Sequence, residues 1–158
     1  MNHYLKHLIK DKRIPIVFDY DGVLFEGRWY EERINMPNET EEKLYEAMKK
    51  GKNLNTRPIP FMVEWVDSLD RYNLHVLSYM HNEIEYDFKL KQIAKFYPTV
   101  KKVIAASSVE DKINHLQLIL EEYGGFIYID DNLDALNLFE NHFNEENCKF
   151  FHVSSLYV

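Results

Sequence analysis

Two acidic motifs stand out in the sequence, because each directly follows an apolar run of strand length. Asp19 and Asp21 follow the first such run, and Asp130 and Asp131 follow a later one. Four carboxylates that lie close to one another cannot all ionise without a compensating charge. A hard divalent cation supplies that charge, and oxygen-only ligands favour Mg²⁺, which also binds substrate phosphate. The two motifs therefore predict a magnesium site if their strands are neighbours.

A hydroxyl and an amine complete the set of residues with predicted chemistry. Ser78 ends another apolar run, and Lys112 lies in the first turn of a helix predicted after a third run. A hydroxyl donor and a point positive charge both suit phosphate oxygens. We therefore expect Ser78 and Lys112 to bind the phosphate of a substrate. Lys101 and Lys102 fit this role less well, because they lie within a predicted strand and should point sideways.

Five apolar runs are predicted to be the strands that position these residues. They are residues 14–18, 74–77, 100–106, 126–129 and 148–153. The stretches between them carry apolar residues at helical spacing, as at Met62, Trp65, Val66 and Leu69. Strands that alternate with helices of this length predict an α/β fold with a three-layer, Rossmann-like, doubly wound parallel sheet. In such a sheet, ligands bind beyond the carboxyl ends of the strands.

The predicted strands differ in character. The first and the fourth are the most continuously apolar, which indicates central strands that are buried on both faces. The third carries Lys101 and Lys102, and the fifth carries Lys149 and His152. Charged side chains are typical of edge strands. Both acidic motifs are thus expected at the centre of the sheet.

Two helix starts have the spacing of a capping box, Asn82 with Glu85 and Ser107 with Glu110. A short helix is also predicted at residues 4–10. The apolar face predicted for the helix after Asn82 comprises Tyr86, Leu90, Ile93, Ala94 and Tyr97.

The length of 158 residues corresponds to about one domain, so residues 1–158 are predicted to form a single domain. A change in composition marks an insertion at about residues 23–58, which we interpret as a flap or a small cap. One further helix is predicted within it, from Asn38 to Gly51. Trp29 and Tyr30 lie in the insertion and are candidates for substrate or flap contacts, with plain packing as the alternative.

The composition excludes several classes of protein. The net charge of −7 disfavours a protein that coats DNA or RNA. A single cysteine, Cys148, excludes an internal disulfide framework and the common cysteine-rich zinc sites, and on a predicted strand it is expected to be buried. No signal peptide and no membrane-length apolar run is visible, so a cytoplasmic location is expected. His3 and His7 have helical metal-pair spacing but lack a third ligand, and we expect them at the surface.

The four motifs, in this order, resemble those of the haloacid dehalogenase (HAD) superfamily of phosphatases and phosphotransferases. The first is Asp19-Tyr-Asp21-Gly-Val after a strand, the second is Ser78, the third is Lys112, and the fourth is Asp130-Asp131. The resemblance covers nearly the whole chain and implies the strand order 5-4-1-2-3. This order agrees with the central and edge strands inferred from the residues.

The resemblance also implies a role for each residue. Asp19 would be the nucleophile that forms an aspartyl-phosphate, and Asp21 would act as the general acid and then the general base. Ser78 and Lys112 would stabilise the phosphoryl oxygens. Mg²⁺ would be held by Asp19, by the backbone carbonyl of Asp21, and by Asp130 and Asp131 in a division that the sequence leaves open.

The expected function is that of a magnesium-dependent phosphomonoester hydrolase. The Ile-Asp-Asp-Asn run at residues 129–132 is similar to the small deoxyribonucleotidase-like branch, so a nucleotide monophosphate is the first expectation for the substrate. A phosphorylated macromolecule, through an exposed phosphorylated end, is the alternative. A non-catalytic phosphate-binding module is a further alternative. Asp21 argues against a carbon–halogen hydrolase, which lacks the second acid, and the motif order argues against a receiver domain. The oligomeric state cannot be inferred.

Overall fold

The computed structural model describes residues 3–27, 46, 56–70 and 73–157 of the chain. Over these residues the protein has an α/β fold with a five-stranded parallel sheet, as the sequence predicts. The strands are β1 (Ile16–Phe18), β2 (Leu74–Tyr79), β3 (Lys102–Ala106), β4 (Phe126–Asp130) and β5 (Cys148–His152). The helices are α1 (His3–Leu8), α4 (Pro60–Asp67), α5 (Glu83–Phe96), α6 (Val109–Tyr123), α7 (Leu133–His142) and the 3₁₀ helix η1 (Val153–Leu156).

The strand order is β3-β2-β1-β4-β5, which is the predicted order read from the other edge. The central strand β1 pairs in parallel with both β2 and β4, so that Phe18 lies between Val76 and Ile129. The strands β3 and β5, which carry charged residues, form the two edges, as predicted. The pairing of β1 with β4 brings the two acidic motifs to the same edge of the sheet.

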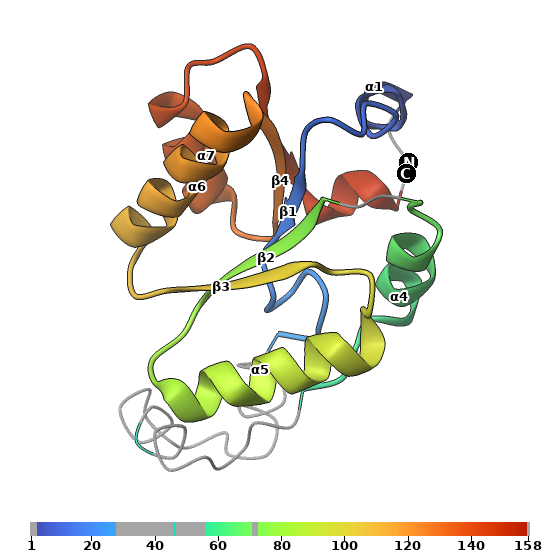
Figure 1. Ribbon diagram of the computed structural model, residues 1–158, viewed down its shortest axis with the longest axis vertical. Coiled ribbons are helices and arrows are strands. Elements are labelled where there is room, and N and C mark those ends of the chain that lie inside the picture. The colour runs from blue at the N-terminus through green and yellow to red at the C-terminus, as the bar shows by residue number, and fades with distance from the viewer. Residues whose placement is uncertain (1–2, 28–45, 47–55, 71–72, 158) are drawn as a thin grey trace.

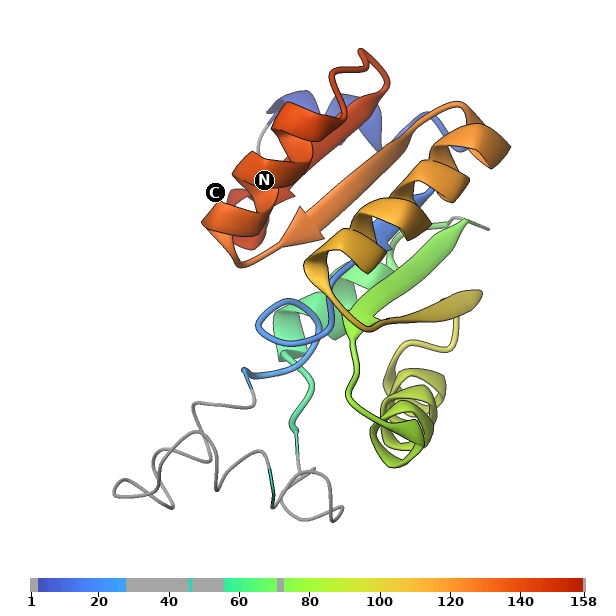
Figure 2. The same ribbon diagram turned by 90° about the vertical axis from the view of Figure 1, so that its left-hand side faces the viewer.

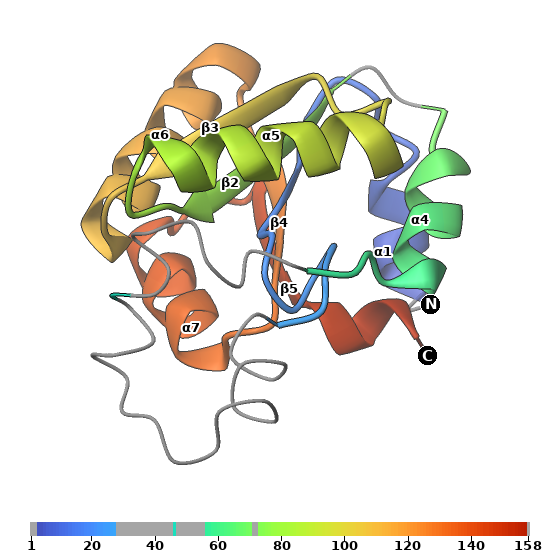
Figure 3. The same ribbon diagram turned by 90° about the horizontal axis from the view of Figure 1, so that it is seen from below.

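Helices cover both faces of the sheet and give the fold three layers (Figure 1). On one face, the core combines side chains of α1, α4, α5 and η1 with Ile16 and Phe18 of β1. On the other face, α6 and α7 pack on a second core that contains Val17 and Tyr128. Figure 2 shows α6 and α7 on the face toward the viewer, and Figure 3 shows α1 and α4 on the other side of the sheet from α6 and α7. Successive residues of a strand point to opposite faces, so neighbouring residues contribute to different cores.

The predicted apolar face of α4 is confirmed, but that of α5 is wrong in part. Met62, Trp65, Val66 and Leu69 are buried as predicted, and so is Cys148; His3 and His7 are exposed, also as predicted. On α5, Ile93 and Tyr97 are buried, but Leu90 is 40% exposed and Ala94 is exposed. The buried residues of α5 are Glu85, Lys89 and Ile93, because the helix turns this polar stripe toward the sheet.

The predicted helix caps differ in outcome. Asn82 caps α5 as predicted, and its side chain accepts a hydrogen bond from the backbone N–H of Glu85. The cap of α6 lies one residue later than predicted: Ser108 accepts from the backbone N–H of Asp111. The Asp111 carboxylate in turn accepts from the N–H and the hydroxyl of Ser107. The capping pair is therefore Ser108 and Asp111, each one residue after the predicted Ser107 and Glu110.

The two ends of the predicted insertion lie side by side. Phe25 forms an isolated antiparallel bridge with Pro58, and the N–H of Glu26 donates to the carbonyl of Arg57 at 2.8 Å. Trp29 and Tyr30 lie outside the described residues, and so does the helix predicted from residue 38 to residue 51 except for Glu46.

In the described part of the chain, none of the helices combines the length and the apolar character that a membrane crossing requires.

Candidate functional site

The candidate site lies at the carboxyl end of the two central strands. Asp19 directly follows β1, and Asp130 is the last residue of β4. The backbone N–H of Asp19 donates to the carbonyl of Ile129 at 2.9 Å, which continues the β1–β4 pairing past the end of β1. This hydrogen bond fixes the position of the two acidic motifs relative to each other.

Three of the four predicted carboxylates gather into one cluster. Ligand atoms of Asp19, Asp130 and Asp131 all lie within 4.8 Å of one another. Asp130 is 2% exposed, while Asp131 lies at the surface of the cluster. The carboxylate of Asp21 is not part of this cluster, and it forms a separate ion pair that is described below.

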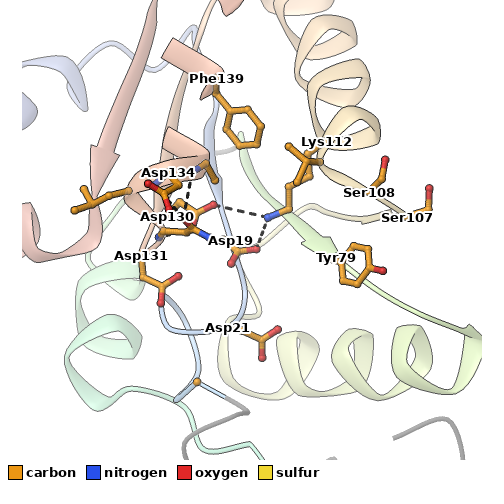
Figure 4. Close-up of a pocket in the computed structure, with 15 residues that line it drawn as sticks. Asp19, Asp21, Tyr79, Ser107, Ser108, Lys112, Asp130, Asp131, Asp134 and Phe139 are labelled. Carbon is orange, nitrogen blue, oxygen red and sulfur yellow. Dashed lines mark hydrogen bonds and ion pairs between the residues drawn. The ribbon is translucent and has the colours of Figure 1, made fainter. Parts of the chain in front are cut away.

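Lys112 joins the cluster from the first turn of α6. Its Nζ donates to Asp19 Oδ1 at 2.9 Å and lies 3.7 Å from Asp130 Oδ2, as the dashed lines in Figure 4 show. The same Nζ donates to the hydroxyl of Tyr128 at 3.2 Å, and this hydroxyl donates to Asp130 Oδ2 at 2.7 Å. The cluster thus combines three carboxylates with one lysine that is 9% exposed.

The electrostatics of the cluster favour a further positive charge. Burial raises the pKa of the Asp19 carboxyl to about 7; Lys112 opposes this shift, while Asp130 and Asp21 add to it. Burial also raises the pKa of the Asp131 carboxyl to about 6, with the charge of Asp130 acting in the same direction. Burial lowers the pKa of Lys112, but Asp19 and Asp130 outweigh that effect and the net shift is upward. One lysine therefore compensates the three acids incompletely.

The residues present fit a hard divalent cation. All the donor atoms of the cluster are carboxylate oxygens, which is the ligand type that Mg²⁺ and Ca²⁺ prefer. Burial is the main cause of the raised pKa values of Asp19 and Asp131, and repulsion from the neighbouring acids adds to it. A cation held by Asp19, Asp130 and Asp131 would relieve this repulsion.

A tight turn after β1 gives the cluster its shape. The backbone N–H groups of Leu24 and Phe25 both donate to the carbonyl of Tyr20 at 3.1 Å. Gly22 has a φ of 76°, which side-chain-bearing residues rarely adopt. A Cβ at Gly22 would also collide with the carboxylate of Asp131. Gly22 is therefore required for two reasons: its positive φ, and the space that the Asp131 carboxylate occupies beside it.

Asp130 and Asp131 do not cap the helix that follows them. The N-cap of α7 is Asn132, whose side chain accepts hydrogen bonds from the N–H groups of Asp134 and Ala135. Asp130 Oδ1 accepts from the N–H of Asn132 at 2.9 Å, which orients this carboxylate. Capping is thus assigned to another residue, and Asp130 Oδ2 faces Lys112 and Tyr128.

The cluster opens into a cavity of about 1130 Å³. Asp19, Asp21 and Lys112 line it, together with the starts of α6 and α7. Exposed apolar side chains also line it, among them Tyr79, Val109 and Leu133. A volume of this size holds a small organic ligand.

Ser78 is the next-to-last residue of β2, but it is buried and does not line this cavity in the described part of the chain. Its hydroxyl oxygen accepts a hydrogen bond from Lys89 Nζ at 2.9 Å. Lys89 also donates to Asp21 Oδ2 at 2.7 Å. The structure thus brings Asp19, Asp130, Asp131 and Lys112 together, and it places Ser78 and Asp21 with a lysine that the sequence analysis missed.

A signal for Lys89 was present in the sequence. Glu85, Lys89 and Ile93 are spaced by four residues, so they share one stripe of α5. The stripe begins at Glu85, three residues after the predicted cap Asn82, and so lies near the end of β2. A charged pair in line with an isoleucine of the predicted apolar face is compatible with a polar site beneath the helix, but the same spacing is common on exposed helix surfaces.

Comparison with known proteins gave no match, either to a protein-family model or to a curated protein.

Proposed function

We propose that this protein is a magnesium-dependent phosphomonoester hydrolase of the HAD type, which works through an aspartyl-phosphate on Asp19. The observation that carries the proposal is the position of Lys112 Nζ, 2.9 Å from Asp19 Oδ1, within a cluster of three carboxylates that faces a cavity. A nucleophilic carboxylate, a cation site and a fixed positive charge are the parts that phosphoryl transfer requires.

In the first step, a carboxylate oxygen of Asp19 attacks the phosphorus of the ester. The bond between phosphorus and the leaving oxygen breaks, and its electron pair stays on that oxygen. Asp21 gives this oxygen a proton, so that a neutral alcohol leaves. Lys112 stabilises the negative charge on the transferring phosphoryl group.

In the second step, Asp21 accepts a proton from a water molecule that attacks the phosphorus of the aspartyl-phosphate. The bond between phosphorus and the Asp19 oxygen breaks, and inorganic phosphate leaves. The same residue thus acts first as an acid and then as a base, and the protein returns to its starting protonation state.

Asp19, Asp130 and Asp131 would hold the Mg²⁺ ion. When bound, the ion offsets the charge of the cluster and of the phosphate and so allows the two anions to approach each other.

We propose a small phosphorylated molecule as the substrate, with a nucleotide monophosphate as the first choice. The cavity of about 1130 Å³ and its apolar residues Tyr79, Val109 and Leu133 support this choice. The single cysteine is in keeping with action in a reducing compartment such as the cytoplasm.

The test is a hydrolysis screen of phosphorylated metabolites, p-nitrophenyl phosphate and a 5′-phosphorylated oligonucleotide, with Mg²⁺ and with EDTA. We expect turnover of nucleotide monophosphates that EDTA abolishes. Turnover of the oligonucleotide alone would make the macromolecular end the substrate. The absence of turnover, with thermal stabilisation by vanadate and Mg²⁺, would overturn the proposal in favour of a non-catalytic phosphate-binding module.

A further inference from the structure

Lys89 of α5 is a buried lysine whose ammonium group reaches the edge of the candidate site. It is 2% exposed. Its Nζ lies 2.7 Å from Asp21 Oδ2, 2.9 Å from Ser78 Oγ and 3.3 Å from both the carbonyl oxygen of Tyr79 and Oε1 of Glu85. The group is thus held by oxygen atoms from three different parts of the chain.

This environment is built around the lysine charge. A buried ammonium group is destabilising unless it is paired and hydrogen-bonded. Asp21 and Glu85 provide two carboxylates, and the ring of Tyr20 lies 4.5 Å from Nζ. Glu85 is itself fixed, because its Oε2 accepts from the N–H of His81 at 2.9 Å. The lysine is therefore rigid, and it can transmit that rigidity to the groups it binds.

The contact with Ser78 determines how that hydroxyl can be used. Lys89 can only donate, so its hydrogen bond occupies a lone pair of Ser78 Oγ. The hydroxyl hydrogen then points away from Lys89, and the acceptor that the described residues offer is the Tyr79 carbonyl at a long 3.4 Å.

The contact with Asp21 divides the two oxygens of this carboxylate. Oδ2 is bound by Lys89, whereas Oδ1 is buried and has no hydrogen-bond partner among the described residues. Asp21 lines the cavity, but Lys89 does not within the described part of the chain. One oxygen is therefore held by Lys89, and the other is buried beside the cavity with its hydrogen-bonding capacity unused in the described part of the chain.

We propose that Lys89 is the positioning residue for Asp21: it anchors one carboxylate oxygen so that the other can transfer a proton to the leaving oxygen of the substrate. This inference rests on the proposed function, and it adds a second lysine to the machinery of the site. Lys89 acts through Asp21, because it does not line the cavity that the substrate would enter.

The role can be tested with two esters that differ only in their need for a proton. An alkyl phosphate releases a weakly acidic alcohol and needs a general acid, whereas 2,4-dinitrophenyl phosphate releases a strongly acidic phenol and does not. The value of kcat/KM reports the steps up to release of the alcohol and so isolates the first transfer. For Lys89→Met we expect kcat/KM to fall about 100-fold with the alkyl ester and less than about threefold with the dinitrophenyl ester.

A double-variant cycle separates positioning from a general loss of structure. Asp21→Asn should give the same pattern, and Lys89→Met combined with Asp21→Asn should be no worse than Asp21→Asn alone. Lys91→Met, at an exposed position of the same helix, is the matched control and should leave both esters unaffected. If Lys89→Met does not fold, Lys89→Met with Glu85→Gln removes one cation and one anion together and allows the same comparison.

The outcomes distinguish the two claims. Equal losses of kcat/KM with both esters, in a wild-type enzyme that hydrolyses both, would overturn the role of Lys89 but leave the proposed function intact. Additive effects of Lys89→Met and Asp21→Asn would overturn it too. A wild-type protein that hydrolyses neither ester would overturn the proposed function and this inference with it.

Discussion

Two lysine–aspartate pairs lie at the same edge of the sheet and differ in every other respect. Lys112 comes from α6, binds Asp19 at 2.9 Å and lines the cavity. Lys89 comes from α5 on the other face, binds Asp21 at 2.7 Å and is buried behind the cavity. The first pair contains the predicted nucleophile, Asp19, and the second contains the predicted general acid, Asp21.

The alternation of side chains along the strands explains this division. Val17 faces the core beneath α6 and α7, and Asp19 lies two residues later, so it meets Lys112. Leu74 and Val76 face the core beneath α5, and Ser78 follows in the same register, so it meets Lys89. Two groups expected to hold one phosphate thus belong to opposite faces. The comparison teaches that a shared sheet edge does not imply a shared partner.

The largest expected effect separates the two aspartates. Asp19→Asn removes the proposed nucleophile, and we expect kcat/KM to fall about 10⁴-fold or more with the alkyl and dinitrophenyl esters alike. Asp21→Asn should spare the dinitrophenyl ester. Steady-state kinetics with both esters and Mg²⁺ provide the measurement. Activity unchanged by Asp19→Asn would contradict the assignment of the nucleophile.

The two lysines should differ in the same way. Lys112→Met removes the charge that is proposed to lie beside the transferring phosphoryl group, and we expect kcat/KM to fall about 10²- to 10³-fold with both esters. Lys89→Met should discriminate between them. If Lys112→Met affected the alkyl ester alone, the two pairs would not have separate roles.

A matched pair of glycines tests the geometry of the carboxylate cluster. Gly22 and Gly124 both have a φ of 76°, but a Cβ would meet the Asp131 carboxylate at Gly22 and nothing within 4 Å at Gly124. Both alanine variants should lose about 1–2 kcal/mol of stability from backbone strain. Gly22→Ala should in addition bind Mg²⁺ about 10- to 100-fold more weakly, because Asp131 must move. Thermal denaturation and calorimetric titration with Mg²⁺ measure the two effects. Equal Mg²⁺ affinity in both variants would show that Asp131 is no ligand.

A further effect is expected on the pH dependence of stability. Burial raises the pKa of Asp19 from 3.8 to about 7, so the metal-free folded protein keeps a proton that the unfolded chain releases. Its free energy of unfolding should therefore fall as the pH rises from about 4 to about 7. Asp19→Asn should make this part of the profile flatter and raise the melting temperature near neutral pH by a few degrees. Thermal melts in EDTA across this range, repeated with Mg²⁺, test the sign. A profile unchanged by the substitution would contradict it.

The fold and the α6 half of the site could be predicted from the sequence. Apolar runs of strand length predicted the five strands, and the charged residues in two of these runs predicted the edge strands. Lys112 could be found because it stands in the first turn of a helix that directly follows a strand. Local patterns of this kind depend on residues that are close in the chain.

The α5 half of the site could not be predicted in the same way. The apolar pattern gave weight to Leu90 and Ala94, which are exposed, and gave no role to Lys89; the spacing of Glu85 and Lys89 alone is compatible with a solvent-facing pair. Glutamate and lysine at this spacing are common on helix surfaces, so the pattern favours that interpretation. The pair is buried because Asp21, 68 residues away from Lys89, compensates its charge, and this contact depends on the tertiary fold.

The proposed mechanism requires that Asp19 becomes phosphorylated, and this can be tested by trapping the aspartyl-phosphate. Asp21→Asn should slow the attack of water, so the aspartyl-phosphate should accumulate when this variant reacts with 2,4-dinitrophenyl phosphate and Mg²⁺. Reduction with borohydride after a rapid quench converts an aspartyl-phosphate to homoserine, which peptide mass spectrometry locates. We predict homoserine at position 19, in a yield that depends on Mg²⁺. Phenol release without modification of position 19, or with modification at another carboxylate, would contradict the proposal.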